Sequence, residues 1–229
     1  MNCAILLSGG SGTRMNMDIP KQYIVVHNKP IFMYAYESIV NCKYIDAVCI
    51  VADQSWHKDI KSWISRTVTD KICIFADPGE TRQLSILNGL NSIERYMNDS
   101  DYVLIHDAAR PLLSRKLINK CFENIEECDG VIPVLPMKDT VYLSTEGRVV
   151  EQLTERQHLY AGQAPELFIY GKYYEANKEL LPHNIYKING STEPAVLYGM
   201  NIKMIDGEEI NFKITTQSDL ERFADIIGG

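Results

Sequence analysis

The sequence lacks an excess of positive charge. Lys and Arg number 23 against 30 Asp and Glu, which gives a formal net charge of -7. A protein that mainly neutralises nucleic-acid phosphates or coats an anionic membrane needs a basic excess. We therefore expect neither nucleic acid nor membrane as a partner, and any phosphate chemistry must use a local basic cluster.

Long apolar runs and paired cysteine motifs are also missing. No stretch reaches the ~18 apolar residues that a membrane-spanning helix needs, and residues 1–7 lack the basic residue that begins a secretory signal. None of the six cysteines has the two-residue spacing of a zinc knuckle or a thioredoxin-type motif. We expect a cytoplasmic protein without disulfides, in which Cys3, Cys49 and Cys73 are small buried hydrophobic residues.

The sequence does contain the pattern of an α/β domain. Apolar runs short enough for buried strands alternate with stretches of helical spacing. The runs are 3–7, 47–52, 72–75, 102–105 and 130–134, and the helical stretches are 32–40, 84–93 and 117–125. This alternation is typical of βαβ units. We predict a single domain over residues 1–229, with a Rossmann-like, mostly parallel sheet and helices on both faces.

The pattern changes after Pro136. Residues 140–143 and 148–153 alternate apolar with polar side chains around a Thr145-Glu146-Gly147 turn, as in an exposed hairpin. This predicts a projecting β-hairpin arm at about 137–157. Beyond the arm we expect further elements: a helix near 170–180, strands near 202–205 and 212–214, and a last helix from about 217 to 227.

A glycine-rich segment follows the first predicted strand directly. It reads Ser8-Gly9-Gly10-Ser11-Gly12-Thr13-Arg14-Met15, and Pro20-Lys21-Gln22 follows closely. Glycines let a backbone approach a phosphate, and Arg14 and Lys21 would add the positive charge that a triphosphate requires. The segment lacks the GK[ST] ending of a P-loop and the third glycine of the dinucleotide-binding pattern, and by itself a simple tight turn explains it equally well.

Asp107 ends another predicted strand, where ligands bind in open α/β sheets. A carboxylate there suits a Mg²⁺ ion that bridges triphosphate oxygens. The alternative is an ordinary helix N-cap, for which Asp is favoured. His106 is interpreted as a structural histidine, because a phosphate monoester is already ionised near neutral pH and needs no base.

Ordered motifs along almost the whole chain resemble one family. They are SGGSGTRM at 8–15 with IPKQY at 19–23, PGETR at 78–82 with Ser85, HDAARP at 106–111, KDT at 138–140, Arg156, and NFKIT at 211–215. In this order they resemble the cytidylyltransferases that act on methylerythritol phosphate and on ribitol phosphate. The resemblance implies CTP and a small polyol or sugar phosphate as substrates, Mg²⁺ as cofactor, and a homodimer in which the arm completes the neighbouring site.

The resemblance also implies roles for individual residues. Arg14, Lys21 and Lys213 would surround the phosphates as the catalytic cations. Arg110, Thr140 and Arg156 would bind the acceptor, and Asp107 would hold the metal. The nucleotide would be bound by residues from three segments: Ser8, Gly9, Gly10, Gly12, Thr13, Gly79, Glu80, Arg82, Ser85, Asp107 and Ala108.

The match is weaker where the acceptor would bind. Ala164 stands where the family usually has threonine before Pro165, and Ser191-Thr192-Glu193-Pro194-Ala195 stands where a Thr-Asp motif is usual. Residues 160–163 look more like the ribitol-phosphate branch. We interpret these departures as an altered acceptor pocket beside a nucleotide half that is kept.

The expected reaction is attack of the acceptor phosphate on the α-phosphorus of CTP, which releases pyrophosphate. Ribitol 5-phosphate, for cell-wall or capsule polymer synthesis, is the leading acceptor. Methylerythritol phosphate, for isoprenoid synthesis, is the alternative. Two other readings stay open: a nucleotidyltransferase using UTP or GTP, which the Gly79 and Ser85 segment disfavours, and a non-catalytic nucleotide-binding protein.

Overall fold

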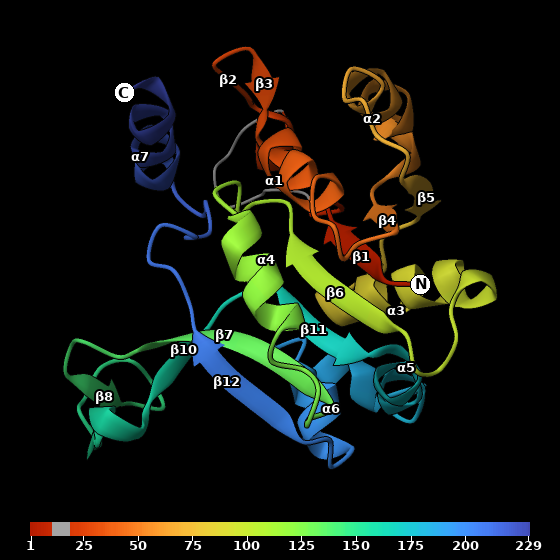
Figure 1. Ribbon diagram of the computed structural model, residues 1–229. Coiled ribbons are helices and arrows are strands. Elements are labelled where there is room, and N and C mark those ends of the chain that lie inside the picture. Colours follow the sequence, from red (N-terminus) through yellow and green to blue (C-terminus); the bar gives the residue numbers. More distant parts are fainter. Residues whose placement is uncertain (11–18) are drawn as a thin grey trace.

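A computed structural model describes residues 1–10 and 19–229. Its centre is an eight-stranded sheet in the order β10-β7-β11-β6-β1-β4-β5, with β12 also paired to β7 (Figure 1). The strands are β1 Cys3–Leu7, β4 Ala47–Val51, β5 Ile72–Ala76, β6 Tyr102–Asp107, β7 Gly130–Pro136, β10 Tyr160–Gly162, β11 Glu166–Ile169 and β12 Ile202–Asp206. The pairs β1–β4, β1–β6, β4–β5 and β7–β12 are parallel, and β11 lies antiparallel between β6 and β7. The prediction of a mostly parallel α/β sheet is confirmed.

Helices cover both faces of this sheet (Figure 1). On one face lie α1 (Ile31–Val40), α2 (His57–Ile64) and α4 (Arg115–Phe122), and on the other lie α3 (Arg82–Ile93), α5 (Tyr170–Lys178) and α6 (Glu193–Leu197). Alternate residues of a strand point to opposite faces. Accordingly Leu6 belongs to the first hydrophobic cluster and Ile5 to the second, which explains why the strands read as continuous apolar runs.

The remaining elements are short or peripheral. A small hairpin, β2 (Val25–Val26) and β3 (Lys29–Pro30), and the last helix α7 (Gln217–Gly228) share a third hydrophobic cluster. Short 3-10 helices occupy Lys21–Tyr23, Gln54–Trp56, Glu94–Tyr96, Arg156–His158 and Asn184–Lys187. None of the helices in the described ranges is both long and apolar enough to cross a membrane.

The predicted arm is present. Its strands β8 (Val141–Leu143) and β9 (Gln152–Thr154) form a separate two-stranded sheet that projects from the main body (Figure 1). Gly147 lies in the turn with φ +69°, a conformation that glycine adopts without strain. The arm leaves large apolar side chains exposed, namely Tyr142, Leu143, Val149, Val150 and Leu153.

Two expectations were wrong. Residues 212–214 form no strand, because the chain there passes beside the sheet and only the Ile214 amide donates to a neighbouring backbone, at Ala109 O. Cys73 is exposed, unlike buried Cys3 and Cys49, because β5 is the last strand on its side of the sheet.

Candidate active site

The carboxyl ends of the central parallel strands meet at one edge of the sheet. Beyond these ends, the Ser8 amide donates to Val51 O and the Ala108 amide donates to Leu7 O. These bonds continue the β1–β4 and β1–β6 pairings by one residue. They bring the predicted nucleotide loop beside the segment that follows Asp107.

The start of the glycine-rich loop is held by Pro20-Lys21-Gln22. The Gln22 side-chain amide donates to the carbonyls of Ser8 and Gly10, over 2.7 and 2.8 Å. Buried Gln22 therefore fixes half-buried Lys21 close to the loop. Gly12, Thr13 and Arg14, which were also predicted to bind phosphate, lie outside the described residues.

The second predicted nucleotide segment packs directly against this loop. A Cβ added at Gly9 would lie 2.4 Å from Pro78 Cβ, so only glycine permits this approach. Gly79 is equally confined, by Leu84, and its amide donates to Ser85 Oγ over 3.0 Å. Gly79 and Ser85 thus shape one turn, from which Glu80 points into solvent.

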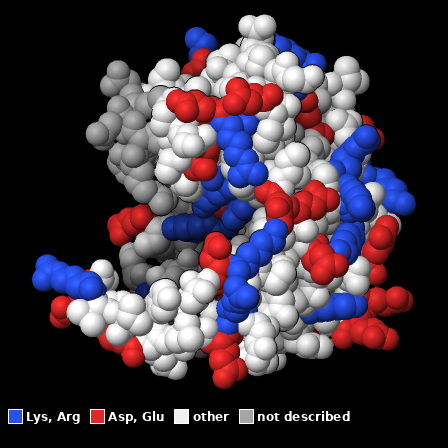
Figure 2. Space-filling view, turned by 90° about the vertical axis from the view of Figure 1, so that its left-hand side faces the viewer, with Lys and Arg blue, Asp and Glu red and all other residues white. Residues whose placement is uncertain are grey.

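Asp107 is the centre of a cluster of three cationic side chains. Arg82 donates to its Oδ1 from Nε and Nη2, over 3.0 and 2.9 Å, and Lys213 Nζ donates to Oδ2 over 2.9 Å. Arg110 Nε lies 3.9 Å from Oδ2. Segments far apart in the chain therefore meet at one carboxylate. Figure 2 shows that Lys and Arg side chains gather along a hollow on one face of the molecule.

The cations determine the charge of Asp107. Burial alone would raise the pKa of Asp107, but Arg82, Lys213 and Arg110 outweigh it and hold this pKa well below its usual range. Burial lowers the pKa of neighbouring His106 to about 4. Its Nε2–H donates to the Arg110 carbonyl over 3.0 Å, so this neutral histidine orients Arg110, as expected of a structural residue.

The arm residues form a second group. Thr140 and Arg156 line one surface pocket, and Arg156 Nη1 donates to Lys138 O over 2.7 Å. Lys138 in turn contacts Glu209, which fixes the base of the arm. Within residues 1–10 and 19–229, no hydrogen bond or ion pair joins Thr140 or Arg156 to the Asp107 cluster.

Sequence reasoning assigned no role to two residues that border the cluster. Asn211, fully buried, donates to Ala164 O over 2.7 Å and accepts from Arg110 Nη1 at its own carbonyl, over 2.8 Å. Glu166, at the start of β11, accepts from Thr192 Oγ1 over 3.1 Å. An acidic residue opening an apolar run was the available signal for Glu166.

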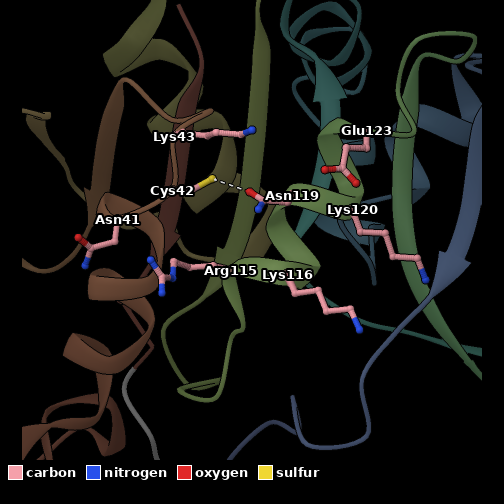
Figure 3. A pocket seen from close by; sticks show the side chains of 8 residues that line it. All are labelled: Asn41, Cys42, Lys43, Arg115, Lys116, Asn119, Lys120 and Glu123. Atoms are coloured by element: carbon pink, nitrogen blue, oxygen red, sulfur yellow. Dashed lines mark hydrogen bonds between the residues drawn. The ribbon is translucent and has the colours of Figure 1, made fainter.

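A separate basic pocket lies between α1 and α4 (Figure 3). Its lining includes Lys43, Arg115, Lys116 and Lys120. These side chains do not converge on one point in Figure 3, and Lys120 is engaged by Asp206. The pocket belongs to the α4 face, whereas Arg82 approaches Asp107 from α3, so we assign it no part in the site.

Over residues 2–228 the sequence matches the family described as IspD: 2-C-methyl-D-erythritol 4-phosphate cytidylyltransferase. The chain belongs to this cytidylyltransferase family. It is therefore an enzyme of the nucleotidyltransferase class, and the resemblance read from the motifs is confirmed.

Relatives of this cytidylyltransferase carry two names. The chain is 31% identical over 225 residues to a 2-C-methyl-D-erythritol 4-phosphate cytidylyltransferase of Lachnospira eligens, covering 96% of each chain. It is 29% identical over 224 residues to a ribitol-5-phosphate cytidylyltransferase of Streptococcus agalactiae, covering 97% of this chain and 93% of the relative. The fold matches the crystal structure of 4-diphosphocytidyl-2C-methyl-D-erythritolsynthase from Anaerococcus prevotii with a TM-score of 0.84 and 24% identity, over 100% and 96% of the two chains.

Proposed function

We propose that the enzyme transfers CMP from CTP to a linear polyol phosphate of the ribitol 5-phosphate type. An acceptor phosphate oxygen forms a bond to the α-phosphorus, the bond from that phosphorus to the bridging oxygen of the β-phosphate breaks, and pyrophosphate leaves. The observation that carries the proposal is the arrangement of Arg82, Arg110 and Lys213 around ionised Asp107, beside the glycine-rich loop. Such fixed cations neutralise the charge that develops in the transition state.

Mg²⁺ fits this site only together with the triphosphate. No group of three or more potential metal-binding side chains lies in the described ranges, and both oxygens of Asp107 accept from cations. One carboxylate suffices for Mg²⁺ when substrate phosphates supply further ligands. We infer that Asp107 contributes one ligand to Mg²⁺ carried by CTP, and that the ion neutralises phosphate charge.

We further propose that the active unit is a homodimer joined by the arms. An isolated two-stranded hairpin is marginal in water, and this arm exposes apolar side chains such as Val149 and Leu153 at 71% and 62%. A second copy covering them would bring Thr140 and Arg156 to the neighbouring acceptor site. At an acceptor concentration far below the raised KM of Arg156→Ala, both variants are nearly inactive. Mixing Arg156→Ala and Lys213→Ala proteins should then restore activity, up to roughly a quarter of wild type, because one site of each mixed dimer carries neither change.

Pyrophosphate release tests the reaction. The purified enzyme is incubated with CTP, Mg²⁺ and either ribitol 5-phosphate, methylerythritol 4-phosphate or no acceptor, and a UTP and GTP series tests the base. Release that requires both CTP and ribitol 5-phosphate supports the proposal. Faster release with methylerythritol 4-phosphate, the substrate in the name of the matching family, would make that compound the acceptor instead. No release with either compound would indicate a binding protein or another acceptor.

A further inference from the structure

A second carboxylate lies on the same face of the sheet as Asp107. In the antiparallel pairing of β11 with β6, Glu166 is opposite Ile105. Side chains opposite each other share a face, and alternate residues of a strand also share one, so Glu166, Ile105 and Asp107 point the same way. The next pair on this face agrees, because Phe168 is opposite Val103 and both belong to the cluster under α3 and α5.

Glu166 is close enough to the cationic cluster to interact with it. Burial raises the pKa of Glu166, while Arg82 and the hydroxyls of Ser191 and Thr192 oppose this shift and Asp107 adds to it. The Glu166 charge also acts on Arg110, where it opposes the lowering of the pKa by burial. Yet none of the ion pairs between described residues includes Glu166, whereas Asp107 is bound directly by Arg82 and Lys213.

The hydrogen-bonding capacity of Glu166 is largely unused. A carboxylate offers about four acceptor positions. Within the described ranges Glu166 accepts a single hydrogen bond, at Oε2 from Thr192. The Ser191 hydroxyl, in a residue that is only 2% exposed, acts on the Glu166 carboxylate but makes no bond of good hydrogen-bond geometry. Buried polar groups are normally satisfied, so these two side chains point to a ligand with hydroxyl groups.

Charge gives the ligand its orientation. A phosphate would be attracted by the cluster in which Arg82, Arg110 and Lys213 outnumber Asp107, and it would be repelled by the Glu166 carboxylate. Hydroxyl groups, in contrast, donate readily to a carboxylate, and such charge-assisted bonds are strong. The acceptor phosphate therefore belongs beside Asp107 and its cations, and the uncharged end belongs beside Glu166 and α6.

We propose that Glu166 is a specificity-determining residue that accepts hydrogen bonds from hydroxyl groups of the acceptor, with Ser191 as a second partner. This inference rests on the proposed function and names which part of the acceptor is recognised. A methyl group against Glu166 would leave its carboxylate oxygens unpaired. Glu166 therefore favours a linear polyol phosphate with free hydroxyls over a branched acceptor that carries a methyl group.

Glu166→Gln is the test, because it keeps the shape and removes the charge. Steady-state rates with ribitol 5-phosphate and methylerythritol 4-phosphate, and calorimetric binding of both in the presence of CMP, are compared between wild type and variant. We expect kcat/KM and affinity for ribitol 5-phosphate to fall about 10- to 100-fold, with a smaller change for the methyl-bearing acceptor and an unchanged KM for CTP. Glu179→Gln, at an exposed carboxylate after α5, is the matched control.

The outcomes separate the two proposals. Equal losses for both acceptors, or none for ribitol 5-phosphate, would overturn the role of Glu166. Binding of ribitol 5-phosphate by wild type without turnover, weakened by Glu166→Gln, would support Glu166 and refute the transfer reaction. Absence of any polyol-phosphate binding by wild type would refute both, and thermal unfolding of the variant shows whether the fold is retained.

Discussion

The nucleotide side and the acceptor side of the site are built differently. On the nucleotide side the structure is tightly packed, because Gly9 and Gly79 have no room for a Cβ. Arg82 and Lys213 also bind both carboxylate oxygens of Asp107 directly. On the acceptor side, Glu166 and Ser191 retain unused hydrogen-bonding capacity. This contrast fits our proposal that geometry formed in advance binds the phosphates, while a few polar groups select the acceptor.

The largest effect should come from removing a cation on the nucleotide side. Lys213→Ala is expected to lower kcat by about 100- to 1,000-fold, because the positive charge that stabilises the transition state is lost. Stopped-flow or coupled pyrophosphate assays measure this, and circular dichroism checks the fold. Lys203→Ala, at an exposed position on β12, is the control, and wild-type rates for Lys213→Ala would contradict its assignment.

A change on the arm should affect the acceptor alone. Arg156→Ala is expected to raise KM for the acceptor about 10- to 100-fold through loss of a charged hydrogen bond, while KM for CTP is unchanged. Arg148→Ala, at an exposed arm position, should have no such effect. If the KM for CTP rose in parallel, the division of the site into two sides would be wrong.

Steric confinement on the nucleotide side can be tested by Gly79→Ala. The added methyl would lie 2.4 Å from Leu84 Cβ, so the turn must shift. We expect the free energy of unfolding to fall by about 1–3 kcal/mol and CTP affinity to fall with it. Urea unfolding and CTP titration measure both, and Gly190→Ala, where a Cβ meets open space, provides the comparison. Unchanged CTP affinity would separate the turn from nucleotide binding.

The smallest effect concerns the helix that follows Lys213. Burial opposes ionisation of Asp219, but hydrogen bonds from Thr215 and Thr216 lower its pKa to about 2. A depressed pKa stabilises the fold above the unfolded value of about 4, and this stability is lost as pH falls toward 2. Asp219→Asn should lower stability at pH 7 by about 0.5–2 kcal/mol and flatten the loss below pH 4. An unaltered pH profile of the melting temperature would contradict the capping role.

Much of the fold could be predicted because apolar periodicity reports burial. The runs at 3–7 and 102–105 became central strands, and Gly147 occupies the expected turn. Strand β11 could not be anticipated, because four residues after a proline carry no periodic signal and their antiparallel insertion depends on tertiary pairing. Residues 212–214 have strand-like composition, but only the Ile214 amide donates to a neighbouring backbone, so no ladder of hydrogen bonds forms.

The candidate site, like the fold, could be predicted only in part from the sequence. Motifs identified Asp107, Arg110 and Lys213, and the fold brings them together. The role proposed for Glu166 depends on which residue of β6 it faces, and a sequence without strand register does not contain that information.

Phosphorus NMR of the complete reaction follows the proposed transfer of CMP to the acceptor phosphate. Enzyme, CTP, Mg²⁺ and ribitol 5-phosphate are followed together, with methylerythritol 4-phosphate in a parallel tube. We expect the signals of CTP to be replaced by those of a CDP-linked polyol and free pyrophosphate, faster with ribitol 5-phosphate. Unchanged CTP in both tubes, or diphosphate-linked product with methylerythritol 4-phosphate alone, would contradict it.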